Sequence, residues 1–371
     1  HGGFSADLVS EIKKAVSIPV ITVGRFTEPQ YAELLVKEGR ADLVAFGRQS
    51  LADPHMPEKA MEERLEDLTP CIACLQGCVA NMYKGEPICC LTNPFLGHEA
   101  EGYPRAEKSK KVMVIGGGVV GMCAAFICAE RGHDVTLYES TDKLGGNMRL
   151  AAYPPGKGDI SNMIRSYIVR CQKAGVKIVM NQEADLDLVK AEKPDAVVVS
   201  TGSKTLILPI EGIDNPAIIH GSDLLDGKRA AGEKVLVVGG GMVGCEIAAF
   251  LGEQQHQVSI IEFRDKMGAD MITEHRKYVM KDFDEYKVEQ IVNAKVCRFY
   301  DDGVEYESPD GERHEIRGFD SVVLSMGFRN YNPFAEQLEE LGQEVYVVGD
   351  ATRARRALDA TKEAYAAAMQ I

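Results

Sequence analysis

The sequence lacks an excess of basic residues: 42 Lys and Arg stand against 56 Asp and Glu, a net charge of −14. A nucleic-acid partner requires basic surface that neutralises phosphates, and an anionic membrane surface attracts basic clusters. We therefore expect neither kind of partner. The chain is 45% hydrophobic and 26% charged over 371 residues, which is typical of a globular protein with two or three domains.

No secretory signal or transit peptide is recognisable in the given sequence, and we expect none. Residues 112–129 form a stretch of 18 residues without a charge, which is near the minimum length for a membrane span. Four of these residues are glycines at the spacing of a nucleotide-binding loop, so we interpret the stretch as a buried strand, a turn and the start of a helix. We expect a cytoplasmic protein.

The first 65 residues alternate between two periodicities. The pattern predicts helices over 6–16, 28–38 and 57–64 and strands over 19–23 and 41–46. Such βα repetition builds parallel sheets or barrels, but two units cannot close a barrel. Residues 66–110 are rich in loops, and 99–110 form a polar linker.

An internal repeat follows. Residues 111–139 match residues 234–262 at an offset of 123, with 13 of 29 positions identical. Both copies contain GxGxxG after a strand pattern and end in a glutamate. One such motif is weak evidence, but two copies with strand, turn, helix, strand and acid in the same order predict two dinucleotide-binding folds.

The glycines and the acid have separate roles in such a fold. The first glycine allows a tight turn, the second lets the backbone approach a pyrophosphate, and the third lets helix and strand pack closely. The acid can bind ribose hydroxyls. These residues are Gly116, Gly118, Gly121 and Glu139 in the first copy and Gly239, Gly241, Gly244 and Glu262 in the second. An ordinary doubly wound domain with glycine-rich turns is the alternative.

Two dinucleotide folds in one chain suggest FAD in one and a nicotinamide cofactor in the other. Several segments assign FAD to the first copy: Thr201 and Gly202 follow a buried strand, Gly349 and Asp350 follow another, and Gly146 and Asn147 follow Glu139. The second copy lies between these segments, so we expect the nicotinamide domain to be inserted into the FAD domain. Glu262 would repel a 2′-phosphate and favours NADH, whereas Arg264 could bind that phosphate and would favour NADPH.

Five of the ten cysteines lie within 20 residues. Cys71, Cys74, Cys78 and Cys90 have the spacing C-x2-C-x3-C-x11-C, in which three thiolates of one loop and a fourth further along can enclose a [4Fe–4S] cluster. Cys89 could replace Cys90, and a structural zinc ion is the alternative metal. The scattered Cys123 and Cys128 are five residues apart in a predicted helix, which favours core packing over a redox dithiol.

Together these features resemble the iron–sulfur flavoenzymes of the old yellow enzyme family, a group that includes 2,4-dienoyl-CoA reductase, 2-enoate reductase and trimethylamine dehydrogenase. In that group an FMN-bearing TIM barrel is followed by a [4Fe–4S] loop and a two-dinucleotide region. The resemblance covers the whole chain and implies that Cys71, Cys74, Cys78 and Cys90 are cluster ligands. It also implies that Gly24, Arg25, Gly47 and Arg48 hold the FMN phosphate after the last two barrel strands. Two arginines in exposed loops are the alternative.

The resemblance implies an α/β fold in four parts. These are a remnant of the FMN barrel over 1–65, the cluster loop and linker over 66–110, an FAD-binding domain over 111–216 plus 318–371, and an NAD(P)-binding domain over 217–317. About six βα units of the barrel are absent before His1. We therefore expect the chain to be the C-terminal part of a larger enzyme.

The expected function is electron input to a reductase of an activated C=C bond, such as a 2-enoate or dienoyl-CoA. Electrons would pass from NADH (or NADPH) to FAD, to the cluster and to FMN, and the substrate would bind in the missing barrel. An NADH oxidase, an amine dehydrogenase of the same family and a non-catalytic subunit are the alternatives. None of the eight histidines lies in a recognisable proton-donor motif, so no catalytic residue is assigned. A homo-oligomer is possible, and the substrate cannot be read from the sequence.

Overall fold

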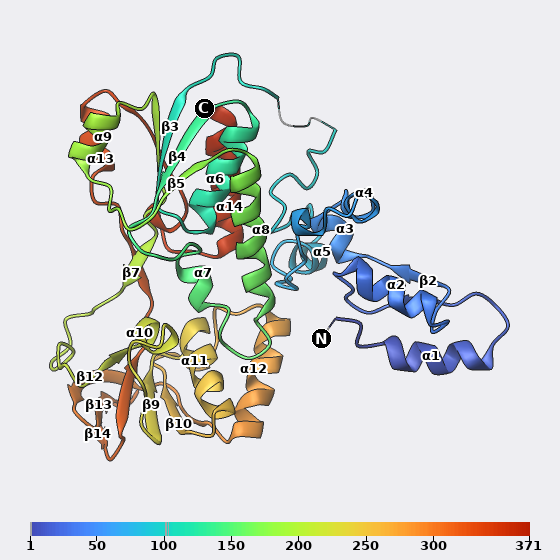
Figure 1. The fold of residues 1–371 in the computed structure, drawn as a ribbon. Helices are drawn as coiled ribbons and strands as arrows, with labels where there is room; N and C mark the ends of the chain where they lie inside the picture. The colour runs from blue at the N-terminus through green and yellow to red at the C-terminus, as the bar shows by residue number, and fades with distance from the viewer. Residues whose placement is uncertain (1, 101, 103) are drawn as a thin grey trace.

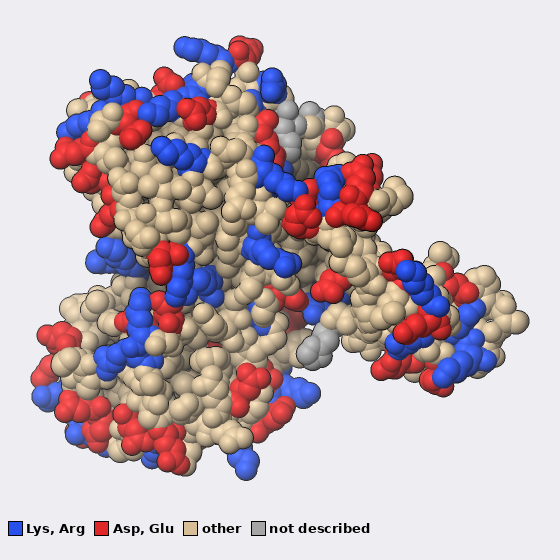
Figure 2. All heavy atoms as spheres, in the orientation of Figure 1, with Lys and Arg blue, Asp and Glu red and all other residues tan. Residues whose placement is uncertain are grey.

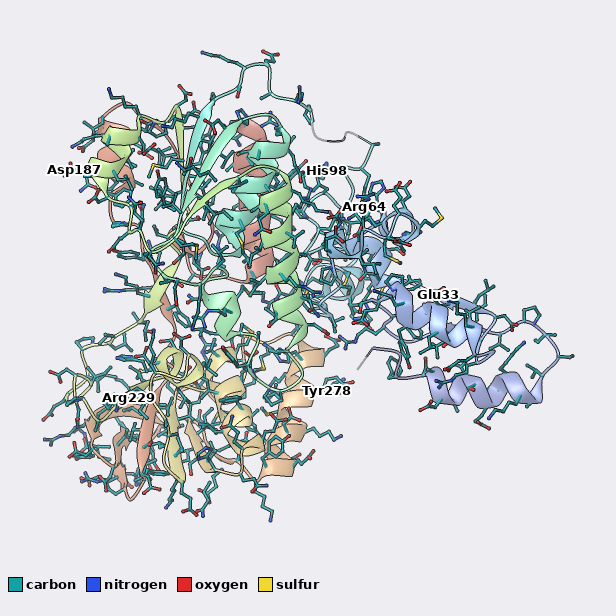
Figure 3. All side chains as sticks on the ribbon, in the orientation of Figure 1. Glu33, Arg64, His98, Asp187, Arg229 and Tyr278 are labelled. Atoms are coloured by element: carbon teal, nitrogen blue, oxygen red, sulfur yellow. The ribbon has the colours of Figure 1, made fainter. Side chains whose placement is uncertain are left out.

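A computed structural model describes residues 2–100, 102 and 104–371. His1, Glu101 and Tyr103 lie outside the described residues, and the last two belong to the linker expected over 99–110. Figure 1 shows three regions: a small N-terminal region at one side and two larger halves stacked beside it. Glu33 lies in the first region, Asp187 in one half and Arg229 in the other (Figure 3).

The N-terminal region contains a two-stranded parallel sheet, in which Ile21 pairs with Leu43. Its elements are α1 (Ala6–Ala15), β1 (Ile21–Val23), α2 (Pro29–Lys37), β2 (Leu43–Ala45), α3 (Arg48–Ala52) and α4 (Met56–Met61). The alternation predicted from the sequence is present, but helix α3 was not predicted. Its five residues are too few to show a helical period, and Gly47 directly before them indicates a turn.

The cysteine segment follows this region. It contains the short helices η1 (Leu65–Asp67) and α5 (Val79–Lys84) and is otherwise irregular. Its apolar residues Ile72, Leu91 and Phe95 are buried in the same core cluster as the helices of the first large half. The segment is therefore attached to that half by hydrophobic packing as well as by the chain.

The first large half is built on a five-stranded parallel sheet of order β17-β6-β3-β4-β5. Its elements are β3 (Lys111–Ile115), α6 (Val119–Glu130), β4 (Asp134–Tyr138), α7 (Asn147–Leu150), α8 (Asp159–Lys173), β5 (Lys177–Val179), α9 (Leu186–Glu192), β6 (Ala196–Val199), α13 (Ala335–Glu340), β17 (Glu344–Val347), η2 (Gly349–Ala351) and α14 (Ala357–Gln370). Helices α6, α8 and α14 lie on one side of the sheet and α9 and α13 on the other (Figure 1).

The central position of β3 explains its sequence. Four of its five residues are buried, because a parallel strand covered by helices on both faces needs apolar side chains on both. Helix α6 is apolar nearly all round for the same reason, and Cys123 and Cys128 lie in its buried surface, as their spacing predicted.

The second large half contains another five-stranded parallel sheet, of order β11-β10-β9-β15-β8, with an antiparallel three-stranded sheet on one side. Its elements are β8 (Ile219–His220), α10 (Gly221–Leu225), β9 (Lys234–Val238), α11 (Met242–Glu253), β10 (Gln257–Ile261), α12 (Thr273–Tyr286), β11 (Glu289–Ile291), β12 (Lys295–Tyr300), β13 (Gly303–Glu307), β14 (Arg313–Ile316) and β15 (Ser321–Leu324). The antiparallel strands cover the face opposite α11 and α12.

Two antiparallel strands, β7 (Ser203–Thr205) and β16 (Phe328–Asn330), connect the halves. The chain leaves the first sheet after β6 and returns to it at β17, so the second half is inserted into the first, as the sequence predicted. Strand β15 pairs with β9 in the second sheet, whereas the predicted division assigned residues from 318 onward to the first half. The domain boundaries at 217 and 318 otherwise stay predictions.

Within the described residues, no helix is long and apolar enough to cross a membrane. The charge-free stretch 112–129 is divided between β3 and α6, which explains its apolar character by burial in the sheet and its covering helix. On the face shown in Figure 2, acidic and basic side chains lie interspersed over all three regions.

Candidate functional site

The first glycine loop joins β3 to α6. Gly116 has a φ of 105°, and a Cβ atom there would lie 2.4 Å from the carbonyl oxygen of Ser200. A Cβ atom on Gly121 would lie 1.9 Å from the carbonyl oxygen of Gly116. Around a Cβ built on Gly118, by contrast, no described atom lies within 4 Å. The loop is thus closed by two obligatory glycines and open at the middle one, where a pyrophosphate would approach.

Glu139 stabilises this loop from the end of β4. The carboxylate is buried, and its Oε2 atom accepts a hydrogen bond of 2.8 Å from the backbone nitrogen of Gly117. Its Oε1 atom accepts hydrogen bonds from the backbone nitrogen and the hydroxyl of Thr141. The acid therefore lies beside the phosphate loop, where a ribose of FAD would meet it.

The other predicted flavin-binding segments meet at the carboxyl ends of β6 and β17. The side-chain amide of Asn147 donates to the hydroxyl of Ser203 at 3.3 Å, and that hydroxyl donates to Oδ2 of Asp350 at 2.9 Å. Three segments that are far apart in the sequence are thereby connected. Ser203 was not predicted as part of this site, although it directly follows the predicted pair Thr201 and Gly202.

The remaining predicted residues lie in the same area. Gly145 bridges to Gly118, which brings Gly146 against the first loop, where a Cβ would lie 3.2 Å from the Cα atom of Gly118. The hydroxyl of Thr201 donates to the carbonyl oxygen of Tyr331. The backbone nitrogen of Gly349 donates to Glu363, 2.8 Å away. These contacts bring the predicted residues to the same end of the sheet as the first glycine loop.

The second glycine loop, between β9 and α11, repeats the first. A Cβ on Gly239 would lie 2.3 Å from the carbonyl oxygen of Ser325, and a Cβ on Gly244 would lie 1.8 Å from that of Gly239. Glu262 is buried and accepts hydrogen bonds from the backbone nitrogens of Gly240 and Arg264.

The two loops differ at the middle glycine. The atoms nearest to a Cβ on Gly241 are the two carboxylate oxygens of Asp270, at 3.6 and 3.8 Å. An acidic side chain therefore lies at the position where the second loop would receive a phosphate group. The sequence contained no signal for this, because Asp270 lies in an irregular segment between β10 and α12.

An ion pair to the buried carboxylate of Glu246 connects the two halves and was also missed from the sequence. Lys157, from the loop before α8, forms an ion pair with Glu246 of α11, and Nε2 of His275 lies 3.6 Å from the same carboxylate. Burial raises the pKa of Glu246, although Lys157 opposes this effect. Burial, followed by the charge of Lys157, lowers the pKa of His275 to about 4, so this imidazole is neutral near pH 7.

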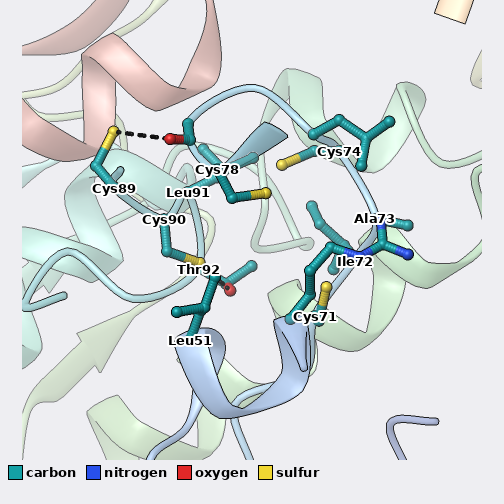
Figure 4. A pocket seen from close by; sticks show the side chains of 13 residues that line it. Leu51, Cys71, Ile72, Ala73, Cys74, Cys78, Cys89, Cys90, Leu91 and Thr92 are labelled. Atoms are coloured by element: carbon teal, nitrogen blue, oxygen red, sulfur yellow. Dashed lines mark hydrogen bonds between the residues drawn. The ribbon is translucent and has the colours of Figure 1, made fainter. Parts of the chain in front are cut away.

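The clustered cysteines surround a cavity at the start of α3. Figure 4 shows the sulfur atoms of Cys71, Cys74, Cys78 and Cys90 turned toward a common space. Cys89 turns away, and its Sγ atom lies 3.8 Å from the carbonyl oxygen of Gly77 (Figure 4). The geometry thus favours Cys90 over Cys89 as the fourth ligand, as the spacing predicted.

The spread of these sulfurs bears on the metal. A tetrahedral zinc ion with Zn–S bonds of about 2.3 Å holds its sulfurs about 3.8 Å apart. Among the described residues, the one group of three potential ligand atoms within 4.8 Å of one another is Asp310, Glu312 and His314, and it includes no cysteine. No three of the four described sulfurs therefore lie within 4.8 Å of one another, so every set of three contains at least one pair farther apart than a single zinc ion requires.

Burial makes these cysteines poor thiolates on their own. It raises the pKa of Cys71 and of Cys90, and it raises the pKa of Cys74 to about 12. The neighbouring cysteines add to the increase for Cys74 by mutual repulsion of their charged forms. Buried thiols with a raised pKa that converge in one cavity fit a site whose protons are released when a metal binds.

The predicted FMN-phosphate residues follow two adjacent parallel strands, β1 and β2. Arg25 forms an ion pair with Asp159 at the start of α8, and Arg48 lines the cysteine cavity. A Cβ on Gly24 would lie 2.3 Å from the hydroxyl oxygen of Ser5, whereas the side of Gly47 is open among the described residues. The ends of β1 and β2 thus bring the pair Gly24 and Arg25 near the pair Gly47 and Arg48. The two guanidinium groups, however, have different neighbours.

Two family models match this chain, one over its first residues and one over most of the remainder. Residues 110–370 match the model of the pyridine nucleotide-disulphide oxidoreductase family. Residues 4–67 match the NADH:flavin oxidoreductase / NADH oxidase family. The resemblance stated from the motifs is confirmed by these two matches together.

Similar proteins span the whole chain. An NADH oxidase of Thermoanaerobacter brockii is 36% identical over 100% of this chain and 58% of its own length. A cinnamate reductase of Clostridium sporogenes is 32% identical over 97% of this chain and 54% of its own. The structure of a 2-naphthoyl-CoA reductase in complex with 2-naphthoyl-CoA superposes with a TM-score of 0.95 at 33% identity, covering 100% of this chain and 57% of that one. The chain thus spans rather more than half the length of these relatives.

Proposed function

Since this chain belongs to the pyridine nucleotide-disulphide oxidoreductase family, with a segment of the NADH:flavin oxidoreductase family before it, we propose that it carries electrons from NADH through FAD and a [4Fe–4S] cluster to FMN. The final acceptor is an activated C=C bond, as in a 2-enoate or a dienoyl-CoA. The assignment to an NAD(P)H-dependent flavin oxidoreductase follows from the family. NADH, the cluster and the acceptor are the proposal.

One observation carries the proposal: the cysteine cavity lies between the N-terminal region and the FAD half. On one side it is lined by Arg48 and Leu51 of α3. On the other side, the hydroxyl of Tyr167 on α8 lies 3.3 Å from the carbonyl oxygen of Thr92, two residues after Cys90. A redox centre in this cavity would be in contact with both flavin-binding parts of the protein.

FAD, when bound, takes two electrons together from a nicotinamide and gives them up singly to an iron–sulfur cluster. The protein's own residues have the task of holding the partners. Gly116, Gly118 and Glu139 hold the FAD pyrophosphate and ribose, and the corresponding residues of the second loop hold NADH. Cys71, Cys74, Cys78 and Cys90 hold the cluster.

The acceptor side of the proposal depends on the N-terminal region. Ile21, Val23 and Leu43 of the two-stranded sheet are each more than half exposed, although parallel strands are normally covered on both faces. The relatives are longer than this chain by some 40% of their own length. We infer that further βα units cover these strands in the whole enzyme and supply the FMN ring pocket and the substrate site.

Anaerobic stopped-flow measurement tests the electron-input part. Purified chain loaded with FAD should lose its flavin absorbance on mixing with NADH and should reduce an artificial one-electron acceptor. Without the remaining barrel it should not reduce cinnamate. Reduction of the C=C bond of cinnamate by this chain alone would contradict the assignment of the substrate site to the remaining barrel. Failure of NADH to bleach the flavin would contradict the proposed electron input.

A second candidate function is direct reduction of oxygen, favoured by the 36% identity to an NADH oxidase. In that case oxygen would accept electrons from FAD without using the cysteines. Oxygen consumption with NADH should then be unchanged when Cys74 is replaced by serine. A loss of one-electron acceptor reduction in the same variant, with oxygen consumption retained, would show that both routes exist.

A further inference from the structure

Helix α3 connects the two parts of the site that belong to different cofactors. It begins at Arg48, directly after Gly47, and both residues are assigned to the FMN phosphate by resemblance. Its side chains then face the loop that leads into Cys71, and Arg48 and Leu51 line the cysteine cavity. Gln49 lies in this helix and is only 2% exposed.

The carboxamide of Gln49 binds the backbone on both sides of Pro70. Its Oε1 atom accepts a hydrogen bond of 2.9 Å from the backbone nitrogen of Cys71. Its Nε2 atom donates one of 3.0 Å to the carbonyl oxygen of Thr69. Both polar atoms of this buried carboxamide thus bind the backbone: one binds Cys71, the first predicted cluster ligand, and the other binds Thr69, two residues earlier.

Other contacts of α3 fix the same loop. At the end of the helix, Oδ2 of Asp53 accepts hydrogen bonds from the backbone nitrogen of Thr69 at 2.9 Å and from Nζ of Lys59 at 2.8 Å. The side-chain amide of Asn93, three residues after Cys90, donates to the carbonyl oxygen of Leu51 at 3.0 Å. The helix therefore holds the chain both before the first cysteine ligand and after the fourth.

Gln49 differs from Asp53 in its partner. Gln49 binds the backbone N–H group of Cys71, a predicted cluster ligand, whereas Asp53 binds that of Thr69. Hydrogen bonds from backbone N–H groups to cluster sulfurs are among the factors that set the potential of an iron–sulfur cluster. The backbone N–H group of Cys71 donates to Oε1 of the Gln49 side chain. It is therefore withheld from sulfur, and an apolar side chain in place of Gln49 would release it.

We propose that Gln49 is a positioning residue that fixes Cys71 against the phosphate end of the FMN region and keeps its N–H group away from the cluster. This inference rests on the proposed function, since it requires that a cluster is held by the four cysteines. Through Gln49, the helix that starts at the phosphate-binding pair is hydrogen-bonded to a cluster ligand.

Two nearly isosteric variants test the inference by redox titration of the cluster, followed by electron paramagnetic resonance in the FAD-loaded chain. Gln49→Met loses the acceptor, so the freed N–H group stabilises the reduced cluster, and the ratio of reduced to oxidised cluster at a fixed potential should rise about tenfold, or ~59 mV. Gln49→Glu keeps the acceptor and adds a negative charge, so the same ratio should fall.

Gln343→Met provides the matched control. The side-chain amide of Gln343 also binds the backbone, donating to the carbonyl oxygens of Pro194 and Asp195. These residues belong to the FAD half, so the loss of this amide should leave the cluster ratio unchanged. Opposite shifts in the two Gln49 variants support the inference. Ratios within twofold of the unsubstituted protein, or shifts in the same direction, overturn it. Absence of iron from the unsubstituted protein would instead overturn the proposed function.

Discussion

The Oδ1 atom of Asp270 lies 2.9 Å from the backbone nitrogen of Met242, the first residue of helix α11. The free N–H groups at such a helix start, together with the helix dipole, are what binds the pyrophosphate of a dinucleotide. Asp270 thus provides a negative group of the protein where the negative group of NADH would bind. If NADH binds at this loop as proposed, its pyrophosphate must compete with Asp270 for the N–H group of Met242.

Replacement of Asp270 by asparagine should therefore tighten NADH binding. The amide has no charge to repel the pyrophosphate and is a weaker partner for the Met242 N–H group, so the dissociation constant should fall by about three- to tenfold. Isothermal titration with NAD⁺ measures this without turnover. Asp265→Asn removes the same charge from an exposed position of the same segment and should change the affinity by less than twofold. Weaker binding in Asp270→Asn would show that the carboxylate assists the nucleotide.

Glu262 should determine the preference for NADH over NADPH. Its buried carboxylate would repel a 2′-phosphate, and Arg264, whose backbone nitrogen it binds, remains to attract one when the acid is removed. In Glu262→Ser the ratio of kcat/KM for NADPH to that for NADH should rise about tenfold, which corresponds to roughly 1.4 kcal/mol. The matching change in the first loop, Glu139→Ser, should lower FAD content and leave this ratio unaltered. An unchanged ratio in Glu262→Ser would exclude it as the selecting residue.

The half-buried His275 should make the protein less stable in mild acid. Its pKa is about 4 in the folded protein and near 6.5 in the unfolded chain, so the unfolded chain binds a proton first as the pH falls. The free energy of unfolding should therefore decrease between pH 6.5 and 4, by as much as about 3 kcal/mol from this group. Glu246 acts in the opposite direction, because burial raises its pKa.

Denaturant unfolding at pH 7 and pH 5 isolates the contribution of His275 in the variant His275→Gln. This variant should show a smaller loss of stability between the two pH values than the unsubstituted protein. His55→Gln, which changes an exposed imidazole beside Glu58, should show the same loss as the unsubstituted protein. Equal losses in all three proteins would mean that His275 is not the responsible group.

The parts of the fold with strong local signals were predictable from the sequence. The two glycine loops, with their following helices and acids, appear where the repeat placed them, because Gly116 and Gly239 have positive φ and tolerate no Cβ atom. The buried strands were recognisable as continuous apolar runs. Strand β15 was misplaced because sheet membership depends on its pairing with β9, which a short apolar run does not specify.

The residues missed at the site act across long sequence separations. Gln49, Lys157 and Asp270 belong to a short helix and two irregular segments, and none is part of a periodic pattern. Each is recognisable only by its partner, since Gln49 contacts a residue 22 positions away and Lys157 one 89 positions away. By contrast, the spacing named Cys90 with Cys89 as the alternative, and the two sulfur atoms point in different directions in Figure 4.

The adjacent pair Cys89 and Cys90 allows the most direct test of the electron path. Iron, sulfide and flavin should be measured after anaerobic purification of the unsubstituted chain and of the variants Cys90→Ser and Cys89→Ser. The account predicts about four irons and one FAD per chain in the unsubstituted protein and in Cys89→Ser. In Cys90→Ser it predicts loss of most of the iron with FAD retained. Full iron content in Cys90→Ser, or its loss in Cys89→Ser alone, would contradict the account.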